Sequence, residues 1–422
     1  MSEPVASPAS GPLARRLTFI DAVVIGLGSM IGAGVFAAFA PAAAAAGSWL
    51  LAGLVVAGFV AFCNATSSAQ LAAQYPTSGG TYVYGRERLG PWPGFLAGWS
   101  FVVGKTASAA AMALTFAAYA VPDAWAKPVA IAAVVMLTVV NTLGVTRTAL
   151  VTRVLVVVAL VALAVAVTIG FSHPAPAAAS PGAPGAEVTP YGVLQSAGLL
   201  FFAFAGYARI ATMGEEVRDP ARTIPRAIVA ALGIVLVVYA LVALSALGAL
   251  GPAGLAASAA PLADVAATSG AAWPGVVVAV GAAAAALGAL IAIIAGIGRT
   301  SLAMARTRDL PGWFAAVHPR FQVPHRAELA VGLVVCTIVA VSDLRGAIGF
   351  SSFGVLLYYL VANASALTQD AAHRRYPRAL AVLGAVGCVV LVATLPPVSI
   401  AVGVTVLAVG VAYRAVRLRV GR

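Results

Sequence analysis

The sequence contains very little charge. Only 9% of its 422 residues are Asp, Glu, Lys or Arg, whereas 62% are hydrophobic. A soluble protein of this length could not cover its surface with so few charges, so a soluble globular domain is excluded. Apolar runs of about 20 residues recur from one end of the sequence to the other, and such runs are typical of transmembrane helices. The sequence therefore predicts an all-α polytopic membrane protein.

Cysteine and histidine are also scarce. Cys63, Cys336 and Cys388 all lie within apolar runs, which excludes a disulfide framework and a thiolate metal site. The four histidines all fall in connecting segments, so they cannot form a relay or a ligand cluster within the membrane. We therefore predict that the protein has no metal site and no cofactor.

The net charge of +12 comes from small groups of basic residues placed between the apolar runs. This distribution argues against nucleic-acid binding, which needs a concentrated basic patch, and favours the lipid bilayer as the partner. We predict twelve spans. Their approximate bounds are 18–45, 48–74, 92–120, 127–144, 150–171, 191–216, 224–250, 273–304, 327–342, 346–368, 378–395 and 398–414.

The basic residues support this topology. With the N-terminus in the cytoplasm, 21 of the 25 basic residues fall in cytoplasmic segments or at their edges. Only Lys127 and Arg345 fall in extracellular segments, and the other two, Lys105 and Arg209, lie within spans. Such a bias follows the positive-inside rule and predicts a cell-membrane protein with both termini in the cytoplasm. The predicted organisation is a cytoplasmic tail at 1–17, a first five-helix repeat at 18–171, an extracellular loop at 172–190, a second five-helix repeat at 191–368, a C-terminal hairpin at 378–414 and a cytoplasmic tail at 415–422.

Two spans contain breaks at corresponding places. Gly28, Gly32 and Gly34 crowd the centre of the first span, although each glycine costs about 1 kcal/mol of helix propensity relative to alanine. The sixth span is interrupted at Ala205-Gly206. Close packing of neighbouring helices is one interpretation, since small residues allow it. The other is a pair of broken helices, one in each five-span half, which indicates an inverted repeat with a solute site at the midplane.

Two basic residues lie within spans. A charge near the bilayer centre costs about 2.5–3.5 kcal/mol on insertion scales, and no acidic residue lies in the middle of a span to pair with Lys105 or Arg209. Lys105 follows the start of its span by about 14 residues, which places it near mid-membrane at 1.5 Å per residue. The alternative is snorkelling toward an interface, which this depth makes difficult. We therefore predict a functional role for Lys105 in solute selectivity or coupling.

Four motifs spaced along the chain carry a family resemblance. They are Gly32-Ala33-Gly34-Val35-Phe36, Pro76-Thr77-Ser78-Gly79-Gly80-Thr81-Tyr82, Ile210-Ala211-Thr212-Met213-Gly214-Glu215-Glu216-Val217 with Pro220 and Ile224-Pro225, and Ser301-Leu302-Ala303-Met304-Ala305-Arg306 with Leu310-Pro311 and His318-Pro319. Together they resemble the amino acid–polyamine–organocation superfamily, and the sixth-span motif is closest to its cationic amino acid transporters. The resemblance implies a five-plus-five inverted repeat with broken helices 1 and 6, two added C-terminal helices and transport by alternating access.

The resemblance also implies a site built mainly from backbone groups. The N–H groups of Ala33 and Gly34 would hold a substrate carboxylate at the start of the second half of span one. The carbonyl groups of Met30, Phe202 and Ala205 would receive an α-amino group, and the ring of Phe202 would act as a gate. The substrate site that we predict comprises Met30, Gly32, Ala33, Gly34, Lys105, Phe202, Ala205, Gly206 and Arg209.

The sequence departs from the family pattern at several positions. Alanine stands at position 33, where a serine is common, and at position 208, where many relatives carry an acid. The missing acid argues against a cationic substrate. Some proton-coupled relatives carry a lysine in span five, but residues 154–169 include no ionisable residue. Lys105 is therefore the candidate either for that coupling role or for direct binding of an acidic group.

These observations predict a secondary active transporter of amino acids or related small metabolites, proton-coupled or working by exchange, and not an enzyme. The alternative is a solute sensor that uses the same scaffold without transport. A channel is a weaker alternative, because its continuous pore would require rings of polar or charged residues that the sequence does not show.

Overall fold

The computed structural model describes residues 17–75, 79–144, 149–175, 189–211, 213 and 216–420. Within these ranges the regular elements are helices, together with one isolated bridge between Leu17 and Val217. The helices of the first half are α1 (Phe19–Met30), α2 (Ala33–Ala37), α3 (Phe39–Ala46), α4 (Leu50–Gln74), α5 (Thr81–Leu89), α6 (Pro91–Ala120), α7 (Asp123–Thr142) and α8 (Ala149–Ser172). Those that follow are α9 (Pro190–Phe204), α10 (Ala208–Ala211), α11 (Pro220–Ala257), α12 (Pro261–Ala267), α13 (Ala272–Arg306), α14 (His325–Val341), α15 (Leu344–Leu367), α16 (Arg378–Thr394) and α17 (Pro397–Val420).

The prediction of an all-α polytopic protein is confirmed. Among the described residues, ten helical stretches are long and apolar enough to cross a membrane. Each of the twelve predicted spans coincides with helical structure. However, α14 and α16 have 17 residues each, slightly fewer than the roughly 20 that a full crossing needs. The number twelve and the domain boundaries therefore stay predictions.

Three features of the fold differ from the predicted spans. The short helices α5 and α12 lie in segments that were predicted only as connections. Helix α11 continues past the predicted end of span seven, but it kinks sharply at Gly251, where φ is 67° and ψ is 168°. Glycine tolerates this left-handed φ, and Pro252 cannot donate a helical hydrogen bond. The predicted end of the span at 250 therefore coincides with the kink.

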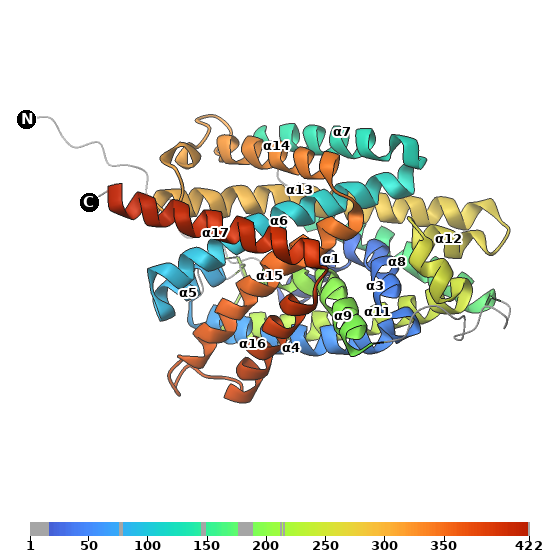
Figure 1. The fold of residues 1–422 in the computed structure, drawn as a ribbon, viewed down its shortest axis with the longest axis horizontal. Coiled ribbons are helices and arrows are strands. Elements are labelled where there is room, and N and C mark those ends of the chain that lie inside the picture. The colour runs from blue at the N-terminus through green and yellow to red at the C-terminus, as the bar shows by residue number, and fades with distance from the viewer. Residues whose placement is uncertain are drawn as a thin grey trace, which may run out of the picture.

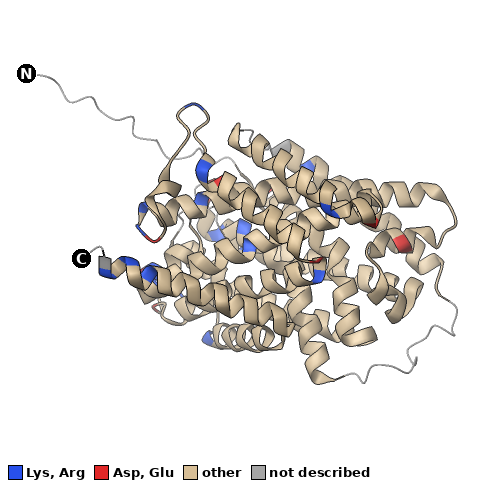
Figure 2. Ribbon diagram, turned by 45° about the horizontal axis from the view of Figure 1, so that its top comes forward, with Lys and Arg blue, Asp and Glu red and all other residues tan. Residues whose placement is uncertain are grey.

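The segments predicted to be cytoplasmic meet at one end of the molecule. The amide of Leu17 donates to the carbonyl of Glu216 at 3.0 Å, and Arg88 forms an ion pair with Asp370 at 3.7 Å. Figure 2 shows most of the Lys and Arg residues toward this end, where α17 finishes.

The segments predicted to be extracellular meet at the opposite end. The hydroxyl of Tyr191 donates to the carbonyl of Leu395 at 3.4 Å, and the ammonium of Lys127 donates to the carbonyl of Ala340 at 2.9 Å. Most of the long helices run between the two ends, along the long axis of Figure 1. The predicted alternation of cytoplasmic and extracellular segments along the chain is therefore consistent with the arrangement of the helices.

Helix α6 packs against α13 and α15 in the interior of the bundle. A Cβ atom on Gly354 would lie only 2.7 Å from the Cα atom of Gly104, so the backbones of α15 and α6 touch there. The hydroxyls of Ser108 and Ser351 hydrogen bond at 2.6 Å in the same contact. Small residues and short hydroxyls are typical of close helix pairs in membranes. This contact fixes the position of Lys105, which directly follows Gly104.

Candidate functional site

The first span is a broken helix. Helix α1 ends at Met30, and helical structure resumes at Ala33 after Ile31 (φ −78°, ψ 57°) and Gly32 (φ −103°, ψ −146°). The amides of Ala33 and Gly34 are the first two of α2, so they have no acceptor within that helix. The prediction of a break at this glycine cluster is therefore confirmed.

The sixth span is also broken. Helix α9 ends at Phe204, a 3-10 turn follows at Ala205–Tyr207, and α10 is only one turn long. The break falls at the predicted Ala205-Gly206. Each discontinuity lies in the first helix of its predicted half, as a five-plus-five arrangement requires.

The two breaks are in direct backbone contact. A Cβ atom on Gly206 would lie 2.1 Å from the carbonyl oxygen of Ser29. A Cβ atom on Gly34 would lie 2.6 Å from the Cα atom of Ala203 on α9. Both interpretations therefore apply: the two spans are broken, and their glycines also allow the backbones to pack closely. In this conformation, Ala203 occupies the space that a side chain at Gly34 would need.

The carbonyl groups at the breaks receive side-chain donors. The Tyr239 hydroxyl of α11 lies 2.6 Å from the carbonyl oxygen of Met30 and 2.9 Å from that of Ala203. Its single proton can serve only one of them at a time. The carbonyl of Ala205 accepts from the ammonium of Lys105 at 3.3 Å and from the Tyr359 hydroxyl of α15 at 3.3 Å.

Lys105 is thus brought to the break in the sixth span, as its predicted role requires. Its ammonium is partly buried and bonded to a backbone carbonyl. None of the ion pairs between described residues includes Lys105. The rings of Tyr207 and Tyr359 stack beside it with their centroids 4.9 Å apart.

The other predicted residues lie around the breaks, with one exception. Phe202 is 8% exposed at the end of α9, and Gly32 faces the methyl group of Ala289 on α13. Arg209 instead pairs with Glu216 at 3.8 Å, with 42% of its side chain exposed. The expectation that Arg209 has no carboxylate partner is therefore wrong. After α10, the amide of Met213 donates to the carbonyl of Ile210 and the amide of Glu216 donates to that of Met213, and these bonds keep Glu216 within reach of Arg209.

Two residues at the breaks, Tyr239 and Tyr359, are not among those predicted from the sequence. Tyr239 is a single tyrosine within the long aliphatic run of the seventh span. A buried tyrosine hydroxyl needs a hydrogen-bond partner, and this requirement could have marked Tyr239 as a polar contact of the core.

The environment of the breaks is closed in this conformation. Met30, Ile31 and Ala33 are each no more than 1% exposed. A cavity of about 20 Å³ lies beside the first break between α1, α8 and α13, lined in part by Gly28, Ile31 and Thr152. This volume suits about one water molecule, so this cavity cannot hold a larger solute in the present conformation.

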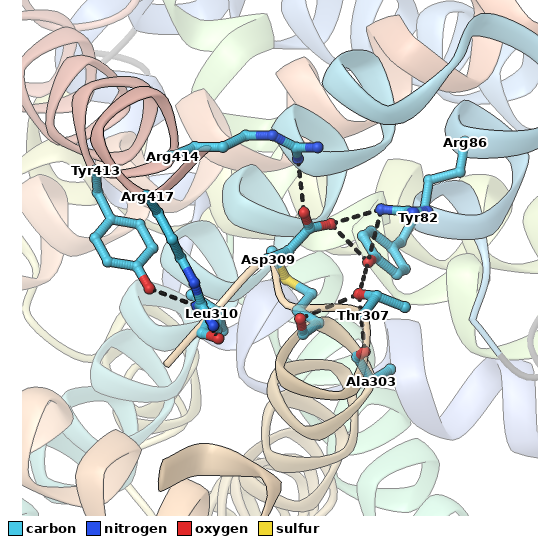
Figure 3. A network of polar contacts seen from close by, with 10 residues as sticks. Tyr82, Arg86, Ala303, Thr307, Asp309, Leu310, Tyr413, Arg414 and Arg417 are labelled. Carbon is cyan, nitrogen blue, oxygen red and sulfur yellow. Dashed lines mark hydrogen bonds and ion pairs between the residues drawn. The ribbon is translucent and has the colours of Figure 1, made fainter. Parts of the chain in front are cut away.

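A second polar cluster lies at the end that is predicted to be cytoplasmic (Figure 3). The carboxylate of Asp309, which follows α13, binds Arg86 of α5 at 2.8 Å and Arg414 of α17 at 2.9 Å. The hydroxyl of Tyr82 donates to the same carboxylate at 2.7 Å. Burial raises the pKa of the Tyr82 hydroxyl, so that it keeps its proton as a donor. The guanidinium of Arg414 also lies over the Phe95 ring, 4.7 Å from its centroid.

Comparison with known proteins agrees with this architecture. The chain matches the family model described as amino acid permease over residues 17–415. It is 60% identical over 407 residues to an uncharacterized transporter of Mycobacterium tuberculosis (strain ATCC 25618 / H37Rv), covering 96% of this chain and 92% of that protein.

More distant relatives have names that state what they carry. The chain is 29% identical over 377 residues to cationic amino acid transporter 7, chloroplastic, of Arabidopsis thaliana, covering 83% of this chain and 65% of that protein. It is 26% identical over 388 residues to the methylthioribose transporter of Bacillus subtilis (strain 168), covering 86% and 83%. The protein is a multi-pass membrane transporter. It belongs to the amino acid permease family of the amino acid–polyamine–organocation superfamily.

Proposed function

We propose that the protein is a secondary active transporter that moves a small amino acid or a related carboxylate across the cell membrane by alternating access, and that it is not an enzyme. The observation that carries this proposal is the contact between the two broken spans at Gly206 and Ser29. Broken helices supply backbone donors and acceptors at membrane depth, where an intact helix has none to offer.

The proposed site uses the two breaks in different ways. The amides of Ala33 and Gly34 begin α2, and they would hold the carboxylate of the solute. The carbonyls of Met30 and Ala205 accept from side chains of the protein in the closed conformation, so a solute that carries an amino group could use them only by displacing those donors. Phe202 lies buried at the same break and would act as the gate.

Coupling is the proposed role of Lys105. A lysine can release its proton when it is buried, whereas an arginine keeps its charge. Lys105 contacts the carbonyl of Ala205, so a change in its charge would act directly on the break of the sixth span. The titratable group that shares this carbonyl is the hydroxyl of Tyr359, whose ring stacks on the ring of Tyr207. Proton movement through Lys105 would then accompany solute movement.

The orientation in the membrane is part of the proposal. The segments with most of the basic residues gather at one end, and the positive-inside rule places that end in the cytoplasm. Both termini would then lie in the cytoplasm.

Flux measurements on the purified protein in proteoliposomes test this function. We expect time-dependent uptake of at least one labelled carboxylate or amino acid, increased by an imposed pH gradient or by unlabelled solute on the opposite side. Binding without any uptake or exchange would contradict the proposal and favour the sensor alternative.

A further inference from the structure

We propose that the transported solute carries a net negative charge, and that Lys105 selects it. This inference rests on the transport function proposed above and deepens it by naming the class of substrate. The class is an organic carboxylate whose negative charge is not cancelled by an ammonium group within the same molecule. It includes acidic amino acids and simple carboxylates that have no amine.

The first observation is that the protein supplies its own cation at the break. Unwound carbonyl groups at broken helices are the acceptors that attract positive charge in transporters. The carbonyl of Ala205 already accepts from the ammonium of Lys105 at 3.3 Å and from the Tyr359 hydroxyl. A second ammonium, from a solute, would have to displace Lys105 and would then lie beside it. Like charges at that distance repel, which selects against cationic solutes.

The second observation is that, among the residues that the structure describes, no carboxylate forms an ion pair with Lys105. The acidic side chains that form ion pairs among the described residues are Asp21, Glu216, Asp219, Asp309 and Asp370, and each is paired with an arginine. Asp21, in the first turn of α1, binds Arg153, and Glu216, between α10 and α11, binds Arg209. The positive charge beside the break is therefore open to neutralisation by a solute. A carboxylate on the solute would supply the missing partner.

The third observation is that the ammonium is held in place by the fold. Gly104, directly before Lys105, touches the backbone of Gly354 on α15. Tyr359, which shares the carbonyl of Ala205 with Lys105, lies five residues after Gly354 on the same helix. The α6–α15 contact therefore fixes both donors relative to the break before any solute arrives. Such preorganisation favours charge selectivity over a flexible, adaptable contact.

Four probes of different charge test this inference on the full-length protein in proteoliposomes. L-glutamate and 2-oxoglutarate are net negative, L-alanine is neutral overall and L-arginine is net positive. We expect wild-type protein to bind the two anions at least about tenfold more tightly than alanine or arginine, because a charged hydrogen bond has about that effect on affinity. Because Lys105 occupies the Ala205 carbonyl, 2-oxoglutarate should bind no more weakly than glutamate.

Two variants of Lys105 and one matched control complete the test. Lys105→Met removes the charge at similar length and should reduce the affinity for both anions by about tenfold or more. Lys105→Arg keeps the charge and should keep the preference for anions. Lys127→Met removes the other lysine, which also donates to a backbone carbonyl, and should change nothing.

The outcomes are separable. If wild-type protein moves alanine or arginine in preference to the anions, the proposed transport function stands and the charge inference is overturned. An unchanged order of affinities in Lys105→Met overturns the role of Lys105. If wild-type protein neither binds nor moves any of the four probes, the charge inference fails, together with the proposed transport of amino acids or carboxylates on which it rests. The order of affinities in wild-type protein decides the question even if a variant does not fold.

Discussion

Gly206 lies directly against the carbonyl group of Ser29, so the break of the sixth span rests on the break of the first. The two residues are 177 positions apart in the sequence, yet their backbones leave no room for a Cβ atom. We therefore expect movement of either broken helix to displace the other. This contact brings the two breaks together, as the proposed shared site requires.

Replacement of Gly206 by alanine should disrupt this contact. The new Cβ atom would lie 2.1 Å from the Ser29 oxygen and 2.6 Å from the Met30 nitrogen, and both are backbone atoms that cannot swing away. We expect Gly206→Ala to lose transport and to destabilise the protein by about 1–3 kcal/mol, as overpacking does. Thermal unfolding and flux of the purified variant measure both effects.

Gly233→Ala is the control for this variant. Nothing lies within 4 Å of a Cβ atom at Gly233 in α11, so this change should be neutral or should stabilise the helix by about 1 kcal/mol. Equal behaviour of the two variants would mean that the Gly206–Ser29 contact is not important for transport.

Tyr239→Phe should affect the breaks without changing the size of the side chain. It removes the hydroxyl that serves the buried carbonyls of Met30 and Ala203. Leaving a buried acceptor unpaired costs about 1–3 kcal/mol, so we expect lower thermal stability and slower flux. Tyr191→Phe is the matched control, because Tyr191 makes only a long 3.4 Å bond near the surface. The idea is untenable if both variants match wild-type protein in stability and flux.

The Asp309 cluster should hold the predicted cytoplasmic ends of α5, α13 and α17 together. The Asp309 and Arg414 side chains are each only 6% exposed, so Asp309→Asn leaves buried Arg414 without its charged partner. Breaking a buried pair from one side costs about 3–5 kcal/mol. We therefore expect a clear drop in the unfolding temperature.

Asp219→Asn is the comparison for the Asp309 variant. Its partner Arg222 is largely exposed, and a surface pair contributes about 0–1 kcal/mol. A melting temperature for Asp309→Asn that equals the one for Asp219→Asn would show that the cluster does not stabilise the fold.

The spans and their breaks could be predicted because each depends on a local pattern. A run of about 20 apolar residues needs no information from elsewhere in the chain to indicate a crossing helix. Likewise, Gly32 and Gly34 make the first span a poor helix on propensity alone, and the break follows at Ile31 and Gly32. The kink at Gly251-Pro252 ends the seventh span for the same local reason.

Lys105 was predicted to belong to the site, but its bond to Ala205 and the contribution of Tyr359 could not be predicted, because these contacts join distant elements. The carbonyl of Ala205 receives Lys105 from 100 residues before it and Tyr359 from 154 residues after it. Nothing in the local sequence of the sixth span encodes these contacts. The partner of Arg209 was missed for a different reason: Glu216 is close in sequence, but their pairing depends on the hydrogen bonds that follow α10.

Cysteine labelling should locate the two ends of the molecule relative to the membrane. Ala259 lies exposed in the 251–272 segment, and Gly312 lies exposed in the segment between α13 and α14. An impermeant maleimide applied to intact cells should label Ala259→Cys and should leave Gly312→Cys unlabelled. The parent protein, whose three cysteines lie within helices, gives the background. Labelling of Gly312→Cys in intact cells would refute the proposed orientation.

Lys105→Arg should separate charge from proton exchange. The arginine keeps a positive charge near the Ala205 carbonyl but cannot release a proton at any physiological pH, whereas a buried lysine can. If Lys105 couples protons to transport, the arginine variant should still bind the solute but should lose the dependence of uptake on an imposed pH gradient. Lys105→Ala should also be insensitive to the gradient, because it has no proton to exchange. Lys127→Arg, at the other lysine, should behave like wild-type protein. Uptake by Lys105→Arg with the wild-type pH profile would show that protons are coupled through another group, and Lys105 would then act only in selecting the charge of the solute.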